Sequence, residues 1–298
     1  MIKREDFLEN EVVDLTEEIK LVSPTDTPLT TMLMARGAVE PAKDITVTWR
    51  ERELNTNRGT LILEGAEAGE AIKSARGSLN NVCQIIEKVT KVSGTARAIS
   101  PKGISDVFEA EVKDRLIETK RDLEWYFLNG TKTLESDSTP RQMAGLVNLV
   151  NSNNVINTAG ALTEDHFLDA LQKMWEKGAQ GEYYALVGAT QKRAINALAK
   201  AGNNVRWIME NGSVANAYGI SVSKIVTDFG EVNLVLDRYM DDKTILTLDL
   251  DEVKIAELRP TFYEDLPKAG DYFKGHVINE STIKLLNSYA GSKILVTA

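Results

Sequence analysis

The sequence predicts an α+β protein whose sheets pair mostly antiparallel. Several stretches place apolar residues at the three- and four-residue spacing of amphipathic helices, whereas segments beyond residue 220 alternate apolar with polar residues, as half-buried strands do. The chain has 298 residues, of which 43% are hydrophobic, and this is enough for one large domain or two of average size.

The first predicted element is an amphipathic helix of about four turns near the N-terminus. Its apolar stripe consists of Leu8, Val12, Leu15, Ile19 and Val22. Pro24 and Pro28 follow in SPTDTPLTTMLMARG and prevent the helix from continuing. Such a stripe has to be buried against another surface, so we interpret this segment as an arm that lies on something else.

Two strand patterns flank a long polar stretch and predict a projecting hairpin. Ile45, Val47 and Trp49 alternate with polar residues, and the stretch that follows is rich in Gly, Asn, Arg and Glu, with one short apolar run from Leu61 to Leu63. Loops of this length without a core of their own are uncommon in compact domains and are usually functional.

The return strand of this hairpin is expected in CQIIEKVTKVSGTARAI, which begins at Cys83. Each of its faces mixes aliphatic with charged residues. A strand half-buried in its own domain would show one clean apolar face. The pattern therefore raises the question of what covers both sides of this strand.

The longest helix pattern lies in the middle of the chain. Its apolar side consists of Phe108, Val112, Leu116, Thr119, Leu123 and Phe127. Asn129 and Gly130 are a helix-stop pair. At about 25 residues the helix would span nearly 40 Å and act as a strut.

The remaining patterns describe a mixed body. Thr163 caps a helix predicted over 163–175, and a buried strand over 183–187 and a helix over 190–201 follow. Four alternating segments come next: SVSKIVTDFG, EVNLVLDRYM, ILTLDL and EVKIAEL. These segments predict the largely antiparallel sheets of the α+β body.

Charge and hydropathy exclude several classes of function. The net charge is −9 and the pI is near 5.0, with acidic and basic residues interspersed, so the surface repels phosphate backbones on average. Tight nucleic-acid binding is therefore not expected as the main role, although contact on one face is allowed. No signal-peptide pattern and no run of eighteen apolar residues occurs, so we expect neither export by a signal peptide nor a membrane span.

No catalytic, cofactor-binding or metal-binding residues are predicted. His166 and His276 are 110 positions apart without ligand spacing, and the lone Cys83 has no accompanying Cys-His signature, so it is expected as a small buried hydrophobe. The sequence contains no G-x-S-x-G, no phosphate-binding G-x-x-x-x-G-K-[ST] and no H-E-x-x-H.

Two further patterns are interpreted as turns. Asp228, Phe229 and Gly230 match a kinase metal-binding triplet but lie between two alternating strands without the other kinase motifs, which indicates a turn. The acidic pairs Asp241 with Asp242 and Asp249 with Asp251 are expected to be solvated turn residues near strand ends.

The order of these parts resembles the major capsid proteins of tailed bacteriophages with the Hong Kong ninety-seven type fold, which encapsulins share. The resemblance covers nearly the whole chain and rests on the order of motifs that are individually weak. They are SPTDTPLTTML, TKVSGTARAI, ETKRDLEWYFLNG, TDFGEVNLVLDRYM and LRPTFYEDLPKAGDYFKGHVINESTIKLLNSYAGSKI.

This resemblance implies a domain plan. The expected parts are an N-terminal arm at 1–40, an extended β-hairpin loop at 41–95, a peripheral domain with a long spine helix at 96–149, an axial domain at 150–248, return strands of the peripheral domain at 249–281, and a C-terminal axial segment at 282–298.

The resemblance also implies partners and a location. The protein would be a non-enzymatic subunit without cofactors that forms pentamers and hexamers of an icosahedral shell around double-stranded DNA, touched non-specifically, in the virion capsid. Assembly would occur in the host cytoplasm, with a portal, a possible scaffold or decoration protein, and no membrane. The two-faced strand would then lie with one face on its own subunit and the other on the next.

The sequence allows two alternative functions, and the resemblance suggests one covalent reaction. An encapsulin-like compartment shares the fold, and a soluble enzyme without recognisable motifs is the alternative from another class. Some family members cross-link a hairpin lysine to a neighbour's asparagine beside a buried acid. Glu280 falls on the corresponding strand and Lys73 near the hairpin tip, but no acceptor asparagine aligns, so Glu280 is expected to be structural.

Overall fold

The computed structural model describes residues 23, 25–55, 59, 61–67, 69, 71, 73–99, 106–179, 182–201, 207–208 and 223–297. Their contacts form a smaller unit, with residues 23, 25, 86–99, 106–121 and 261–279, and a larger unit, with the described residues of 26–85, 122–260 and 280–297. The predicted arm helix, with its stripe from Leu8 to Val22, lies outside the described residues, and so does Pro24.

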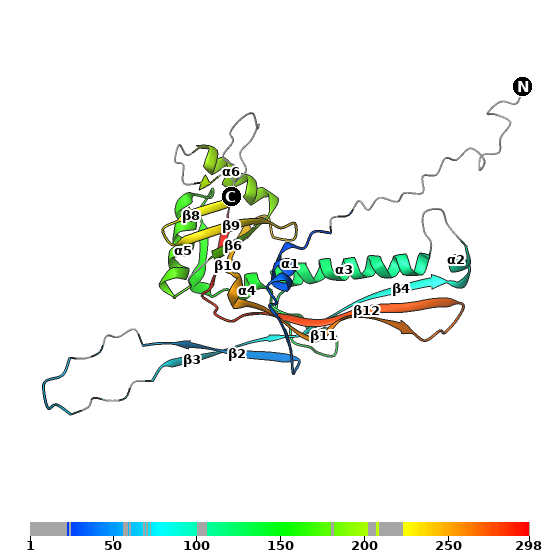
Figure 1. Cartoon of the computed structure of the whole chain (residues 1–298), viewed down its shortest axis with the longest axis horizontal. Coiled ribbons are helices and arrows are strands. Elements are labelled where there is room, and N and C mark those ends of the chain that lie inside the picture. Colours follow the sequence, from blue (N-terminus) through cyan, green and yellow to red (C-terminus); the bar gives the residue numbers. More distant parts are fainter. Residues whose placement is uncertain are drawn as a thin grey trace, which may run out of the picture. The chain divides into compact units, whose positions relative to one another are not determined.

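A seven-stranded mixed sheet forms the centre of the larger unit (Figure 1). Its strands, in spatial order, are β5 (Val155–Thr158), β13 (Gly291–Val296), β10 (Thr244–Asp249), β6 (Glu182–Val187), β9 (Gly230–Leu236), β8 (Lys224–Thr227) and β7 (Trp207–Ile208). Four of its six pairings are antiparallel, which confirms the predicted bias. All six residues of β10 are buried because it lies inside the sheet.

Two helices pack with this sheet and lie where the sequence predicts them. α5 (Glu164–Glu176) begins after Thr163, whose backbone N–H donates to His166 Nδ1 over 3.1 Å, so the histidine completes a capping box. α6 (Ala189–Ala201) follows β6. The core here includes Phe167, Leu171, Met174, Tyr183, Ile195, Ile245 and Ile294.

The predicted strut is α3 (Val107–Asn129). Asp106 Oδ1 accepts the N–H of Phe108 over 2.8 Å and caps the first turn. The helix ends at Asn129 as predicted, and a Cβ on Gly130 would lie 2.6 Å from the carbonyl oxygen of Met143, so only glycine fits there. Within the predicted apolar stripe, the side chain of Leu116 is exposed in the isolated subunit.

A four-stranded sheet contains two long strands. Its order is β1 (Val39–Pro41), β11 (Val253–Leu266), β12 (Tyr272–Leu285) and β4 (Gln84–Ser93), and β1 runs parallel to β11 with Val39 opposite Ile255. The short elements along the chain are α1 (Pro28–Ala35), α2 (Gly94–Ala98), α4 (Leu146–Leu149), and single 3₁₀ turns at Ser152–Asn154 and Leu250–Glu252.

The hairpin differs from its prediction in the identity of the return strand. β2 (Thr46–Glu53) pairs antiparallel with β3 (Ala75–Val82), and this two-stranded ribbon is separate from both larger sheets (Figure 1). The strand expected to return, beginning at Cys83, is β4, which pairs with β12 instead. β3 escaped detection because ARGSLNNV has no apolar alternation that would mark a strand.

Among the described helices, none is long and apolar enough to cross a membrane.

Candidate functional site

One face of the β2–β3 ribbon is fastened to the rest of the larger unit. Trp49 is buried and its Nε1–H donates to the carbonyl oxygen of Leu285 over 2.9 Å. On the same face, the amide of the buried Asn81 donates to the carbonyl oxygen of Ile283 over 2.8 Å. Further along, Lys177 forms an ion pair with Glu53 at 2.5 Å. These contacts fix the orientation of the ribbon about its own axis.

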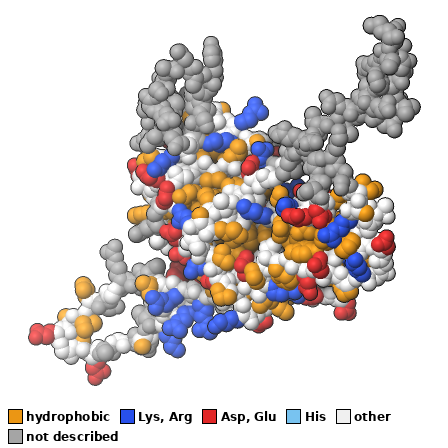
Figure 2. Space-filling model, turned by 45° about the vertical axis from the view of Figure 1, so that its right-hand side comes forward, with side chains coloured by type: hydrophobic (Ala, Val, Ile, Leu, Met, Phe, Trp, Pro, Cys, Tyr) orange, Lys and Arg blue, Asp and Glu red, His pale blue; other side chains and the backbone are white. Residues whose placement is uncertain are grey.

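The opposite face of the ribbon is exposed and basic. It carries Arg50 and Arg52 on β2 and Arg76 on β3, and the register places Arg52 directly opposite Arg76. Figure 2 shows blue Lys and Arg side chains gathered over the ribbon.

The described part of the excursion between β2 and β3 exposes three consecutive apolar side chains. Leu61 is 97% exposed, Ile62 67% and Leu63 85%. A run of this kind on a water-facing loop is unfavourable unless another surface covers it. It is therefore a candidate contact site.

The strand with aliphatic and charged residues on both faces is β4, and its two faces have different surroundings. Gln84, Ile86, Thr90 and Val92 on one face are buried by the chain itself. On the other face Ile85 and Val89 are each 44% exposed, and they alternate with the charged Glu87 and Lys91. One face is thus covered within the subunit, and the other presents aliphatic groups to its surroundings.

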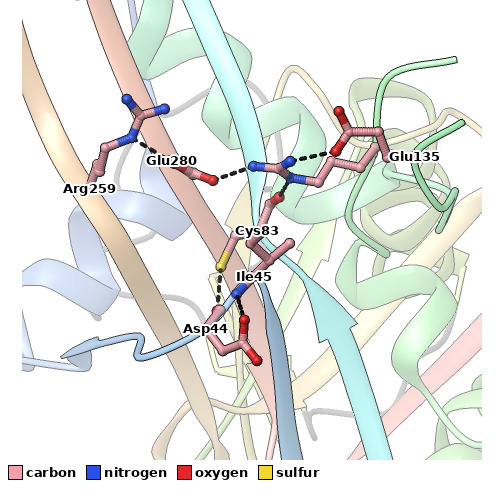
Figure 3. Close-up of polar contacts among 7 residues, drawn as sticks. Asp44, Ile45, Cys83, Glu135, Arg259 and Glu280 are labelled. Carbon is pink, nitrogen blue, oxygen red and sulfur yellow. Dashed lines mark hydrogen bonds and ion pairs between the residues drawn. The ribbon is translucent and has the colours of Figure 1, made fainter. Parts of the chain in front are cut away.

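A charged network holds the point at which the chain passes from the ribbon to β4 (Figure 3). Glu280, with 5% of its side chain exposed, accepts from Arg141 and, over 2.6 Å, from Arg259 Nε. Arg141 Nε donates to the carbonyl oxygen of Cys83 over 2.7 Å, and its Nη1 pairs with Glu135 at 2.6 Å. Both arginines were missed from the sequence because they lie far from Glu280 along the chain.

Cys83 lies between β3 and β4, at the centre of this network. Its N–H donates to the carbonyl oxygen of Ile45 over 2.8 Å, so the junction is tied to the start of the hairpin. Burial raises the pKa of its thiol to about 11, and the negative charge of Glu280 acts in the same direction. The predicted role of a small buried side chain agrees with this environment.

We expect the substitution Glu280→Ala to lower the free energy of unfolding of the isolated subunit by roughly 3 kcal/mol, because it leaves the largely buried Arg141 without its buried partner. Denaturant unfolding measures this change. The matched control is Glu135→Ala, which removes the solvent-facing partner of the same arginine and should cost less than about 1 kcal/mol. Equal losses in the two variants would contradict the assigned role of Glu280.

A second buried carboxylate caps α1. Glu124 of α3 is fully buried, and it accepts the N–H of Leu29 over 2.7 Å and the N–H of Thr30 over 2.8 Å. These are the otherwise unpaired donors of the first turn of α1, whose own N-cap residue, Thr27, makes no side-chain cap. Glu124 therefore fastens the start of α1 to the strut.

Glu124 shares its site with a second acid, Asp237, which is also fully buried. Asp237 Oδ1 accepts the N–H of Tyr239 over 2.8 Å, and its buried Oδ2 has no hydrogen-bond partner within the described part of the chain. Burial, reinforced by the charge of Asp237, raises the pKa of Glu124 to about 7, and burial also raises the pKa of Asp237. The neighbouring Arg238 pairs with Asp26 on the surface at 3.4 Å, so it does not neutralise this pair.

The residues considered for chemistry make local contacts. His166 caps α5, and His276 Nδ1 lies 2.6 Å from Glu87 Oε1. Over the residues that the structure describes, no group of three or more His, Cys, Asp or Glu side chains could hold a metal ion. Phe229 lies in a turn whose Gly230 has a φ of +138°, so the resemblance to a kinase triplet is accidental.

The acidic pairs also act locally. Asp241 Oδ2 accepts the hydroxyl of Thr244 over 3.0 Å, and Asp249 Oδ1 accepts the N–H of Asp251 over 3.0 Å. Asp251 pairs with Arg36 at 2.6 Å on the surface. These contacts match the predicted turn roles, although Asp249 itself is buried.

Comparisons with known proteins point to one kind of assembly. The family model of the SU10 major capsid protein matches residues 3–298. The fold is similar to the cyanophage A-1(L) capsid, with a TM-score of 0.72 and 15% identity over 99% of both chains. It is also similar to the capsid of an empty GTA particle, with a TM-score of 0.69 and 13% identity over 99% of this chain and 98% of that one.

A compartment protein has a comparable fold. The SrpI encapsulin of Synechococcus elongatus matches with a TM-score of 0.61 and 13% identity, over 96% of this chain and 93% of that one. No curated protein sequence matches the chain.

Proposed function

This chain belongs to the SU10 major capsid protein family, and from that premise we propose how its surfaces serve a tailed-phage capsid. The family match, which covers nearly the whole chain, confirms the resemblance inferred from the sequence. The protein is a structural, non-enzymatic subunit of a homo-oligomeric shell, and its place is the virion capsid.

The finer assignments are our proposal. The subunit forms pentamers and hexamers around double-stranded DNA, which it touches without sequence preference, and it meets a portal and any scaffold or decoration protein during assembly in the host cytoplasm. The β2–β3 ribbon supports the proposed contacts between subunits. Trp49 and Asn81 fasten one of its faces to the same subunit. The other face and the exposed apolar run at Leu61–Leu63 are not covered by any of the described residues.

We assign the parts of the chain accordingly. Residues 1–40 act as the arm and 41–95 contain the extended loop, although β4 at the end of that range belongs to the four-stranded sheet. Residues 96–149 and 249–281 supply the spine helix and the long strands of the peripheral domain. Residues 150–248 and 282–298 supply the axial domain, in agreement with the seven-stranded sheet, whose strands come from both ranges apart from the end of β10.

An encapsulin-like compartment is the second candidate, because the SrpI encapsulin shares the fold. Purified particles distinguish the two. Electron microscopy combined with nuclease treatment should show closed icosahedral shells that protect double-stranded DNA when the particles come from infected cells. Shells that enclose protein cargo and no DNA would favour the compartment, and a monomer or dimer at all concentrations would contradict both.

A further inference from the structure

We propose that Arg50, Arg52 and Arg76 form a binding face for an acidic surface on a second copy of this chain. The inference rests on the proposed shell function and adds to it the chemistry of one contact. It concerns charge recognition by the exposed face of the β2–β3 ribbon, which none of the comparisons assigns.

The three arginines share one side of the ribbon. Residues 50 and 52 are two apart on β2, and Arg76 lies directly across from Arg52 on β3, so all three project from the same face. Like charges placed directly opposite each other in a ribbon are destabilising. The isolated ribbon therefore carries a repulsion that an anionic partner would remove.

Within the described part of the chain, no acidic side chain neutralises this charge. The neighbouring acids of β2 are engaged elsewhere: Glu51 accepts the N–H of Ser288, and Glu53 pairs with Lys177 at 2.5 Å. No ion pair or hydrogen bond to the side chains of the three arginines is found within the described residues. The guanidinium groups are thus available to form bidentate pairs with carboxylates.

Charge complementarity favours a second copy as the partner. The chain carries −9 overall, so without these three positive charges its remainder carries −12, and another copy offers an acidic surface on average. The opposite face of the same ribbon is fastened to its own subunit by Trp49 and Asn81, so the arginine face is the one that a neighbouring copy can reach.

The central test is the double substitution Arg52→Glu with Arg76→Glu. It reverses the sign of the face but keeps a like-charged pair across the strands, so the internal repulsion of the ribbon is retained. We expect a folded subunit, judged by circular dichroism and thermal unfolding, whose shell yield falls at least about tenfold. The matched control reverses Arg193 and Lys243, which are exposed elsewhere in the larger unit, and should retain most of the yield.

The single substitution Arg52→Glu separates assembly from folding. It places an acid opposite Arg76, so the isolated subunit should become slightly more stable while shell assembly weakens. Arg52→Lys with Arg76→Lys keeps the charge and should recover much of the yield. Wild-type assembly should also weaken as NaCl is raised from about 0.05 M to about 0.5 M, more than assembly of the double glutamate variant.

Three outcomes would overturn the proposal. Normal shell yield from the double glutamate variant would show that the face contributes nothing to assembly. Normal shells that retain less DNA would identify nucleic acid as the partner instead. A yield that falls equally in the control pair would show a general effect of charge. In each case wild-type shells would still form, so the proposed function would stand; absence of wild-type shells would remove that function itself.

Discussion

A subunit in which residues 55–74 are replaced by a short Gly-Ser turn should remain folded but fail to close into shells. The deletion keeps β2 and β3 intact and removes the exposed apolar run at Leu61–Leu63. If the loop and ribbon of each subunit bury on the order of 1,000 Å² of apolar surface on neighbours, the hydrophobic contribution is tens of kcal/mol before ordering costs. Size-exclusion chromatography and electron microscopy measure the loss.

Two further observations accompany this deletion. The triple substitution of Leu61, Ile62 and Leu63 by serine keeps the loop length and should weaken assembly through the apolar tip alone. In wild-type subunits trypsin should cut first at Arg52 and Arg76, and assembled shells should protect both sites. Complete shells from the deletion variant, or equal cleavage in free and assembled protein, would show that neighbours do not cover this segment.

Replacing Asp237 with asparagine should stabilise the subunit at pH 8 while changing little at pH 5. In the wild-type protein the pKa of the buried Glu124 is about 7 when folded, against an ordinary value of 4.5. The folded state therefore holds a proton that the unfolded state releases. The contribution of protonated Glu124 to the free energy of unfolding is fully present below about pH 4.5. This contribution is lost as the pH rises to about 7, and the total loss is about 3 kcal/mol.

Asparagine is neutral at every pH, so it removes the negative charge that Asp237 places beside Glu124. Its amide N–H can donate to Glu124, and its oxygen can still accept the N–H of Tyr239. At pH 8 we expect the variant to unfold with about 1–2 kcal/mol more free energy than the wild type, and to show a flatter dependence on pH. Asp242→Asn makes the same chemical change at an exposed position and should shift stability by less than about 0.5 kcal/mol. A constant difference between Asp237→Asn and the wild type from pH 5 to pH 8 would contradict the electrostatic coupling of Glu124 to Asp237.

The elements predicted correctly from the sequence were those with strong local signals. α3 ends at the predicted Asn129, and α5 begins after the predicted cap at Thr163. These features depend on residues within one or two turns, so spacing alone reveals them. Leu116 lies on the predicted stripe but is exposed, because the packing of a helix face depends on elements remote in the sequence.

The polar network and the pairing of β4 required the structure. Arg141 and Glu280 are 139 residues apart, and neither position has a local pattern that indicates burial. Glu124 has a local sequence signal, because it is an acidic residue between Leu123 and Trp125 in an apolar stretch. That signal does not identify Asp237 as its partner. The prediction that the chain assembles into a shell came from its resemblance to phage capsid proteins, because no residue pattern in a single chain indicates such an assembly.

The buried thiol of Cys83 can report on local opening of the junction between β3 and β4. With a pKa near 11, only about one thiol in a thousand is ionised at pH 8 in the closed state, and burial shields that fraction from reagents. Modification by an aromatic disulfide therefore proceeds mainly when the junction between β3 and β4 opens transiently and exposes the thiol. Because Cys83 is the only cysteine, its modification rate in free subunits and in finished shells measures how far neighbours slow that opening, without any label being introduced.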